Sequence, residues 1–112
     1  MTNRLSIAVA GAAGRMGRQI IGAAASRNHQ ITGGTEAPDS PYLNEDLGVL
    51  AGIQLLGSTP SGTISAAAAT ADTWIDFTLP TVTLSALDGL TSSSVKTVVI
   101  GTTGFSSQVE EA

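Results

Sequence analysis

The chain has 112 residues, 42% of them hydrophobic and 12% charged, with a formal net charge of −4 at pH 7. This length suits one domain with a single hydrophobic core, and the hydrophobic fraction excludes a chain that is disordered by composition. The acidic balance argues against a nucleic-acid partner, because the 5 basic residues are scattered, apart from Arg15 and Arg18, and form no patch for phosphates.

The absence of cysteine excludes disulfides, thiolate chemistry and cysteine-ligated metals, and the single histidine belongs to no cluster with metal-ligand spacing. No apolar run approaches the roughly 20 residues of a membrane span, and the N-terminus lacks the apolar core of a signal peptide. We therefore expect a cytoplasmic protein that holds no metal and contacts no membrane.

A strand over residues 5–10, a glycine turn and a helix over residues 15–26 are the first predicted elements. The turn places Gly11, Gly14 and Gly17 at a spacing of three, in the order G-x-x-G-x-x-G. Residues without a Cβ let the backbone pass close to a phosphate, and a helix N-terminus offers free N–H groups and a partial positive charge. The pattern favours a dinucleotide pyrophosphate site over a purely structural turn.

Two side chains beside this turn have more than one interpretation. Arg15 could pair with a phosphate or an acid, or lie in solvent in the first turn of the helix. We expect Met16 to pack in the core, together with Ile20, Ile21 and Ala24 on the inner face of the helix, while its backbone N–H faces the pyrophosphate.

The next predicted strand, residues 30–35, ends at Glu36. Glu36 follows Gly17 at close to the roughly 20-residue interval of the acid that binds the ribose of NAD. Ala37 and Pro38 offer no cation for the 2′-phosphate of NADP, so the sequence favours NADH over NADPH. The alternative interpretation of Glu36 is an acid exposed to solvent in a loop.

The middle of the chain predicts a loop over residues 37–48, a short strand over 53–56, a loop over 58–62 and a small-residue helix over 63–71. A strand over residues 73–77 follows. In that strand, Trp74 is expected in the core, Asp76 as a hydrogen-bonded structural acid and Phe77 at the end, within reach of a cofactor. His29 is expected to be exposed, at the opposite edge of the sheet.

A helix over residues 82–90 and a strand over 96–100 come next, and Ser107 and Glu110 form a capping box that starts another helix. Strands that alternate with helices predict an α/β fold, a Rossmann-like parallel sheet with helices on both faces. Ligands of such sheets bind beyond the carboxyl ends of the strands. The candidate cofactor-binding residues there are Gly11, Ala12, Ala13, Gly14, Arg15, Met16, Glu36, Thr78, Gly101, Thr102 and Thr103.

Three segments together resemble the 4-hydroxy-tetrahydrodipicolinate reductase (dihydrodipicolinate reductase) family: residues 9–18 with G-R-M-G, 76–80 with D-F-T-L-P and 99–105 with G-T-T-G. The resemblance implies an oxidoreductase that uses NADH or NADPH to reduce the product of dihydrodipicolinate synthase to tetrahydrodipicolinate, in lysine and diaminopimelate biosynthesis. It also implies that the pyrophosphate lies along residues 11–16, the adenosine ribose at Glu36, and the nicotinamide at residues 101–103, with Thr103 nearest the substrate.

The chain departs from the family pattern at two positions. Many members carry Arg where this chain has Ala37, and some carry Arg where it has Leu79. The family's substrate-binding half, with its His-His pair, its Lys and its Ser-Gly-Thr loop, has no counterpart here. We therefore expect residues 1–112 to be an incomplete dinucleotide-binding domain without catalytic residues, inactive alone, whose full-length protein is a homotetramer with a small-molecule substrate. The alternatives are another NAD(P)-dependent dehydrogenase of an amino-acid pathway and a non-catalytic nucleotide-sensing module.

Overall fold

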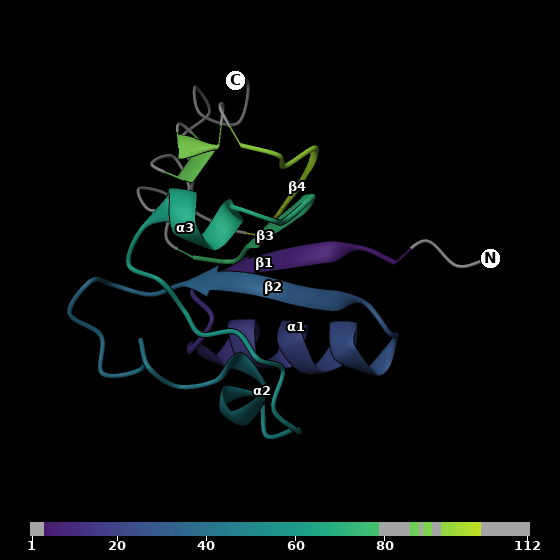
Figure 1. The fold of residues 1–112 in the computed structure, drawn as a ribbon, viewed down its shortest axis with the longest axis vertical. Coiled ribbons are helices and arrows are strands. Elements are labelled where there is room, and N and C mark those ends of the chain that lie inside the picture. Colours follow the sequence, from purple (N-terminus) through teal and green to yellow (C-terminus); the bar gives the residue numbers. More distant parts are fainter. Residues whose placement is uncertain (1–3, 79–85, 88, 91–92, 102–112) are drawn as a thin grey trace.

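The computed structural model describes residues 4–78, 86–87, 89–90 and 93–101, which form a parallel sheet with helices on both faces (Figure 1). The strand order is β2-β1-β3-β4, so the chain crosses from one side of β1 to the other between β2 and β3. The strands are β1 (Ser6–Ala10), β2 (Gln30–Thr35), β3 (Thr73–Asp76) and β4 (Thr97–Ile100). The expected Rossmann-like α/β fold is confirmed, with a topological switch point at the carboxyl end of β1.

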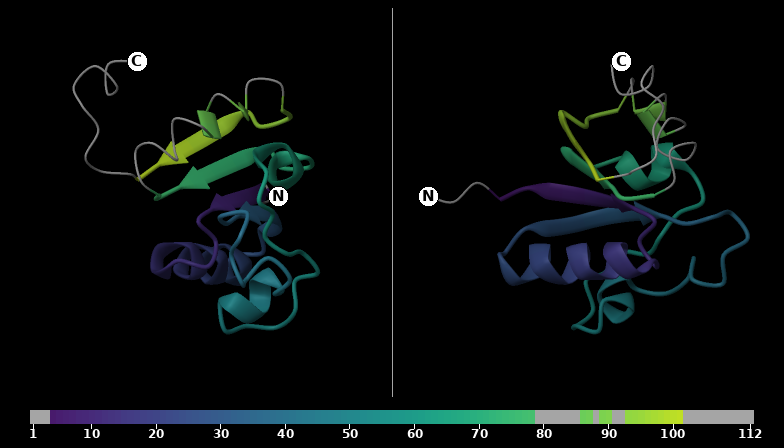
Figure 2. Two further views of the ribbon diagram at one scale, coloured as in Figure 1. Left: turned by 90° about the vertical axis from the view of Figure 1, so that its left-hand side faces the viewer. Right: turned by 180° about the vertical axis from the view of Figure 1, so that it is seen from behind.

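Helices α1 (Arg15–Ser26) and α2 (Leu47–Leu50) cover one face of the sheet, and α3 (Ile64–Ala68) lies on the other (Figures 1 and 2). Because side chains alternate along a strand, β1 supplies both hydrophobic cores. Ile7 and Val9 are buried under α1 and α2, and Ala8 and Ala10 are buried on the side of α3. The central strand is thus buried on both faces, as its apolar sequence predicts.

The core on the α3 side is built largely from small residues around one large side chain. Trp74 has no exposed surface, and the other buried members are Ala8, Ala10, Ala67, Ala68, Ala71, Ala86 and Leu90. A Cβ on Gly33 would overlap the carbonyl oxygen of Ala67, so α3 approaches β2 at backbone distance. The prediction that Trp74 packs in the core is confirmed.

The inner face of α1 differs from the prediction at one residue. Gly17, Ile21 and Ala24 are buried and Ile20 is half-buried, whereas the Met16 side chain is 44% exposed. Residues at positions i, i+4 and i+7 share one face of a helix, and here Gly17 rather than Met16 starts that series. The expectation that Met16 packs in the core is therefore wrong.

The segment between β2 and α3 is also different from the prediction. Residues 53–56 form no strand, and α2 lies where we expected a loop. Asp46 caps α2: its Oδ2 accepts hydrogen bonds from the N–H groups of Gly48 at 2.7 Å and Val49 at 3.3 Å. The same carboxylate accepts from the N–H groups of Leu56 at 2.9 Å and Gly57 at 2.7 Å, which holds the returning chain beside α2 instead of in the sheet.

The remaining boundaries lie close to the predicted ones. The helix α1 and the strand β2 have the predicted bounds, and α3 is shorter than predicted at both ends. The predicted helix over residues 82–90 lies partly outside the described residues, of which 86–87 and 89 are helical. The predicted helix that starts at Ser107 lies wholly outside them.

Two kinds of feature are absent from the described residues. In these residues, no helix is both long and apolar enough to cross a membrane. Nor do the side chains in the described ranges include a group of three or more His, Cys, Asp or Glu that could hold a metal ion.

Gly17→Ala is expected to lower the free energy of unfolding by about 1–3 kcal/mol, because the added Cβ would overlap the carbonyl oxygen of Gly11 and the backbone of Ala12. Gly22→Ala is the matched control on the same helix, since a Cβ there meets nothing within 4 Å. This control should raise stability by about 0.5–1 kcal/mol through helix propensity. Denaturant unfolding of both variants checks the pair, and equal stability of Gly17→Ala and the wild type would contradict the packing described.

Asp46→Ala is expected to lower stability by about 1 kcal/mol at neutral pH through loss of the cap. Burial by itself would raise the pKa of Asp46, but the backbone N–H groups of Leu56, Gly57, Gly48 and Val49 lower this pKa below its ordinary value. A lowered folded-state pKa stabilises the fold above the unfolded-state pKa of about 3.9, and this contribution is lost as the pH falls through the folded-state value.

The difference in unfolding free energy between the wild type and Asp46→Ala should therefore shrink as the pH falls below about 4. Unfolding measured from neutral to acidic pH tests this, with Asp39→Ala, an exposed acid of the same segment, as the control. A difference that stays constant with pH would rule out the ionised carboxylate as its source.

Candidate functional site

The glycine turn between β1 and α1 uses its glycines for different reasons. Gly11 has a φ of +69°, and a Cβ on it would lie 2.8 Å from Cγ2 of Thr78. Gly17 must lack a Cβ for α1 to approach the turn, as described above. Gly14 is exposed, and the nearest atom to a Cβ on it is the carbonyl oxygen of Gly11 at 3.3 Å. Gly14 is therefore the position from which a ligand can approach the turn closely.

The N-terminus of α1 is open to a ligand. Gly14 is the N-cap residue, no side chain caps the helix, and its first turn holds no acidic residue. Arg15 and Met16, the first two helical residues, are both exposed. Uncapped first-turn N–H groups and the positive end of the helix dipole form a site suited to a phosphate anion.

Glu36 lies directly beside this turn. Its Oε2 accepts a hydrogen bond from the N–H of Ala13 at 2.9 Å, and its own N–H donates to the carbonyl of Ser61 at 3.1 Å. The N–H of Ala12 donates to the carbonyl of Thr35 at 3.0 Å, which joins the turn to the end of β2. The side chain is only half-buried, so the carboxylate is held in place and can still accept hydrogen bonds from ligand hydroxyl groups.

The end of β3 borders the turn from the other side. Asp76 has no exposed surface, and its Oδ1 accepts hydrogen bonds from the N–H of Thr78 at 2.9 Å and from Oγ1 of Thr78 at 2.5 Å. The Nε1 of Trp74 donates to the other carboxylate oxygen at 3.5 Å. Asp76 thus holds Thr78 against Gly11, in agreement with the expected role of a hydrogen-bonded structural acid.

The end of β4 meets the end of β3 at Gly101. The N–H of Gly101 donates to the carbonyl of Asp76 at 2.8 Å, and a Cβ on Gly101 would overlap the ring of Phe77. The Phe77 side chain is 38% exposed and lies against this glycine. Thr102 and Thr103 lie outside the described residues.

The sheet therefore gathers most of the predicted site residues at one edge, where the carboxyl ends of the parallel strands meet (Figure 2). The described ones are Gly11, Ala12, Ala13, Gly14, Arg15, Met16, Glu36, Thr78 and Gly101. His29 lies away from them: its Nδ1 accepts from the N–H of Leu5 at 3.0 Å, before the amino end of β1, and its side chain is half-buried rather than exposed.

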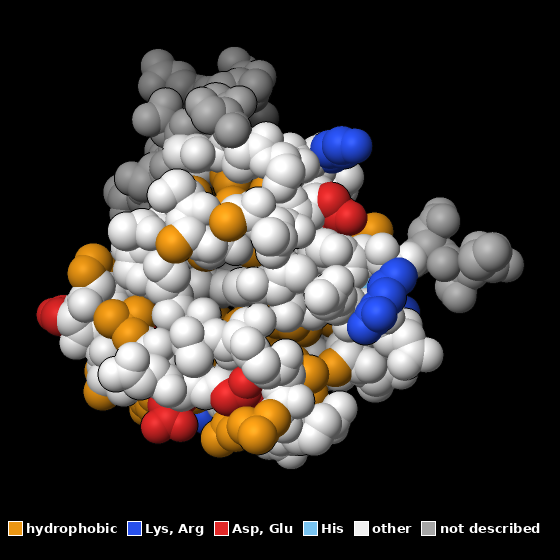
Figure 3. Space-filling model, in the orientation of Figure 1, with side chains coloured by type: hydrophobic (Ala, Val, Ile, Leu, Met, Phe, Trp, Pro, Cys, Tyr) orange, Lys and Arg blue, Asp and Glu red, His pale blue; other side chains and the backbone are white. Residues whose placement is uncertain are grey.

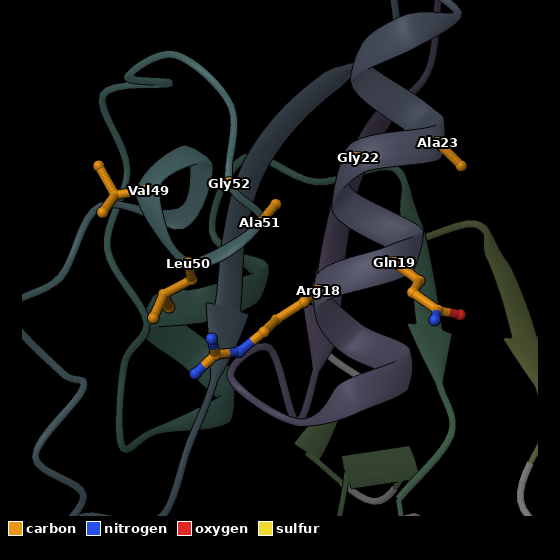
Figure 4. A pocket seen from close by; sticks show the side chains of 8 residues that line it. All are labelled: Arg18, Gln19, Gly22, Ala23, Val49, Leu50, Ala51 and Gly52. Carbon is orange, nitrogen blue, oxygen red and sulfur yellow. The ribbon is translucent and has the colours of Figure 1, made fainter.

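An open groove lies on the outer side of the helical layer, between α1 and α2 (Figure 4). Its lining residues are Arg18, Gln19, Gly22, Ala23, Val49, Leu50, Ala51 and Gly52. Arg18 is the member that also contacts the glycine turn, because its Nε donates to the carbonyl of Ala13 at 2.7 Å. The other members come from α1, from α2 and from Ala51 and Gly52 after it, so the groove extends away from the glycine turn and meets it at Arg18.

The contact of Arg18 with Tyr42 was missed in the sequence. The Arg18 guanidinium lies over the Tyr42 ring, with Cζ 5.3 Å from the ring centroid. The sequence places Arg18 close after the glycine turn, but it does not indicate that Tyr42 lies beside it. The position of Tyr42 depends on the path of the loop after Glu36.

A family model described as "Dihydrodipicolinate reductase, N-terminus" matches residues 5–112. The chain is 42% identical over 101 residues to the 4-hydroxy-tetrahydrodipicolinate reductase of Trichlorobacter lovleyi. The aligned residues make up 90% of this chain and 38% of the relative. This chain is 42% identical over 113 residues to the reductase of Nitrosomonas eutropha (96% and 40%) and 41% identical over 101 residues to that of Methylococcus capsulatus (89% and 37%).

The chain spans about two-fifths of the length of these curated relatives. The family model covers nearly all of this chain, including every element of the sheet and each candidate site residue. The chain thus belongs to the dihydrodipicolinate reductase family, to whose N-terminal part it corresponds.

Proposed function

We propose that this chain is the NAD(P)H-binding part of a 4-hydroxy-tetrahydrodipicolinate reductase. One observation carries the proposal: Ala13, in the glycine turn that precedes the uncapped α1, donates its N–H to Glu36 at the end of β2. This contact holds Glu36 beside the glycine turn, which supports an arrangement in which the turn binds the pyrophosphate and Glu36 the ribose of one dinucleotide. The family match favours this function over another dehydrogenase or a nucleotide sensor.

The pyrophosphate in this proposal lies at the exposed side of Gly14, where the first-turn N–H groups of α1 donate to it. Arg15 is exposed at the same turn and adds a positive charge. Glu36 accepts hydrogen bonds from the hydroxyl groups of the adenosine ribose. These contacts orient the cofactor along the carboxyl edge of the sheet, from β2 toward β3 and β4.

The nicotinamide end lies at Thr78 and Gly101 in this proposal. The family resemblance assigns Thr102 and Thr103, which lie outside the described residues, to the same end of the cofactor, with Thr103 nearest the substrate. Phe77 and Gly101 are in contact, which restricts the space beyond β3 and β4. The cofactor supplies the hydride for reduction of the product of dihydrodipicolinate synthase, and this chain positions the cofactor. In this proposal the groups that bind the substrate and move protons lie outside residues 1–112, and these residues alone are expected to be inactive.

NADH is the favoured cofactor in this proposal. A carboxylate at position 36 attracts the 2′-hydroxyl of NADH and repels the 2′-phosphate of NADPH, and Ala37 supplies no cation next to it. A cytoplasmic location, expected from the sequence, and a homotetramer of the full-length protein, implied by the family resemblance, complete the proposal.

Glu36→Gln is expected to raise the Kd for NADH by about 10–100-fold, since hydrogen bonds to a charged group contribute about 1.5–3 kcal/mol. NADPH binding should weaken less, because the substitution also removes the repulsion of the 2′-phosphate. Titration of the full-length protein with each cofactor, followed by the fluorescence of Trp74, measures both constants.

Glu45→Gln is the matched control, because Glu45 is an exposed acid in the loop after Glu36. It should leave both constants unchanged. An unchanged NADH affinity in Glu36→Gln would refute the ribose contact, and a wild-type protein that binds neither cofactor would refute the proposed function.

A further inference from the structure

Arg18 is tied to the same backbone residue as Glu36. Its Nε donates to the carbonyl oxygen of Ala13 at 2.7 Å, while the N–H of Ala13 donates to Oε2 of Glu36 at 2.9 Å. The backbone bonds of Ala13 join these two hydrogen bonds, so Nε of Arg18 and Oε2 of Glu36 are at most about 10 Å apart. The guanidinium is therefore a near neighbour of the proposed ribose site.

The Arg18 guanidinium is held in a fixed position. Its Cζ lies over the ring of Tyr42, 5.3 Å from the centroid, and its Nε donates to the carbonyl oxygen of Ala13. Figure 4 shows the side chain leaving α1 on the side that faces α2, with the two Nη groups at its tip. Within the described part of the chain, these Nη groups have no hydrogen bond or ion pair, so they can still donate to a ligand.

Arg18 is also singled out by the positions of the other basic residues. The chain has 5 Lys and Arg residues. Arg4, Arg27 and Lys96 stand before β1, after α1 and before β4, at the amino ends of the strands. Figure 3 shows most of the blue side chains on the right-hand side of the molecule. Only Arg15 and Arg18 remain near the carboxyl edge, and Arg18 is the one bonded to Ala13.

The free edge of a guanidinium is well matched to a phosphate, because its paired N–H groups can bind two phosphate oxygens at once. A nucleotide with a 2′-phosphate carries that group on the ribose that Glu36 is proposed to hold. Neither Glu36 nor Ala37 can neutralise its charge. A cation beside Glu36 can neutralise the 2′-phosphate even though position 37 carries no Arg.

We propose that Arg18 is a specificity-determining residue, which binds the 2′-phosphate of NADPH and so lets the site accept NADPH as a second cofactor beside NADH. This inference rests on the proposed function, because it assumes that the ribose lies at Glu36. Arg18, in α1, would thus bind the 2′-phosphate, which Ala37 in the loop after β2 cannot do.

The test is the ratio of the NADPH Kd to the NADH Kd, measured by titration of the full-length protein. Arg18→Gln should raise this ratio about tenfold, and Arg18→Lys, which keeps the charge but loses the planar group, about threefold. Arg15→Gln should weaken both cofactors alike, since the pyrophosphate is common to both. Arg27→Gln, at the far end of α1, should change neither constant.

A purely structural role of Arg18 would weaken NADH and NADPH equally, and an unchanged ratio in Arg18→Gln would overturn the inference. If Arg18→Gln does not fold, an unchanged ratio in Arg18→Lys would overturn it as well. A wild-type protein that binds NADH without measurable NADPH binding contradicts this inference alone, whereas one that binds neither cofactor contradicts the proposed function.

Discussion

The close approach of α1 to the turn before it is the constraint on which the rest of the site depends. Gly17 sits so near the carbonyl oxygen of Gly11 that no side chain fits between them. This contact holds the N-terminus of α1 at the carboxyl edge of the sheet and leaves Gly14 exposed there. Two glycines therefore build the turn, and the middle one leaves room for a ligand.

A single residue, Ala13, then connects the turn to the surrounding segments. Its N–H binds Glu36 at the end of β2, and its carbonyl binds Arg18 in the next turn of the helix. Arg18 in turn contacts Tyr42 in the loop after β2. A negative and a positive group are thus both bonded to one residue, so in our proposal a ribose at this place meets their combined charge rather than that of Glu36 alone.

The sequence predicted the elements whose pattern is local and strong, and failed where distant contacts decide. The apolar run of β1 and the amphipathic pattern of α1 are of the first kind, because each element buries a continuous face. The helix α2 is of the second kind, since Asp46 is bonded to Leu56 and Gly57 as well as to its own helix. The apolar and amide residues at 53–56 are also compatible with a strand. The hydrogen bonds from Leu56 and Gly57 to Asp46 hold this segment beside α2 instead. The contact between Arg18 and Tyr42 depends on the same loop.

The central claim, that a dinucleotide binds along the turn and the end of β2, is tested most directly by the backbone amide signals of the protein during titration with NADH. Our account predicts the largest chemical-shift changes at residues 12–16 and at Glu36, with little change at Gly22 or Gly52 in the groove between α1 and α2. Changes concentrated in that groove, with the signals of the glycine turn unaffected, would contradict it.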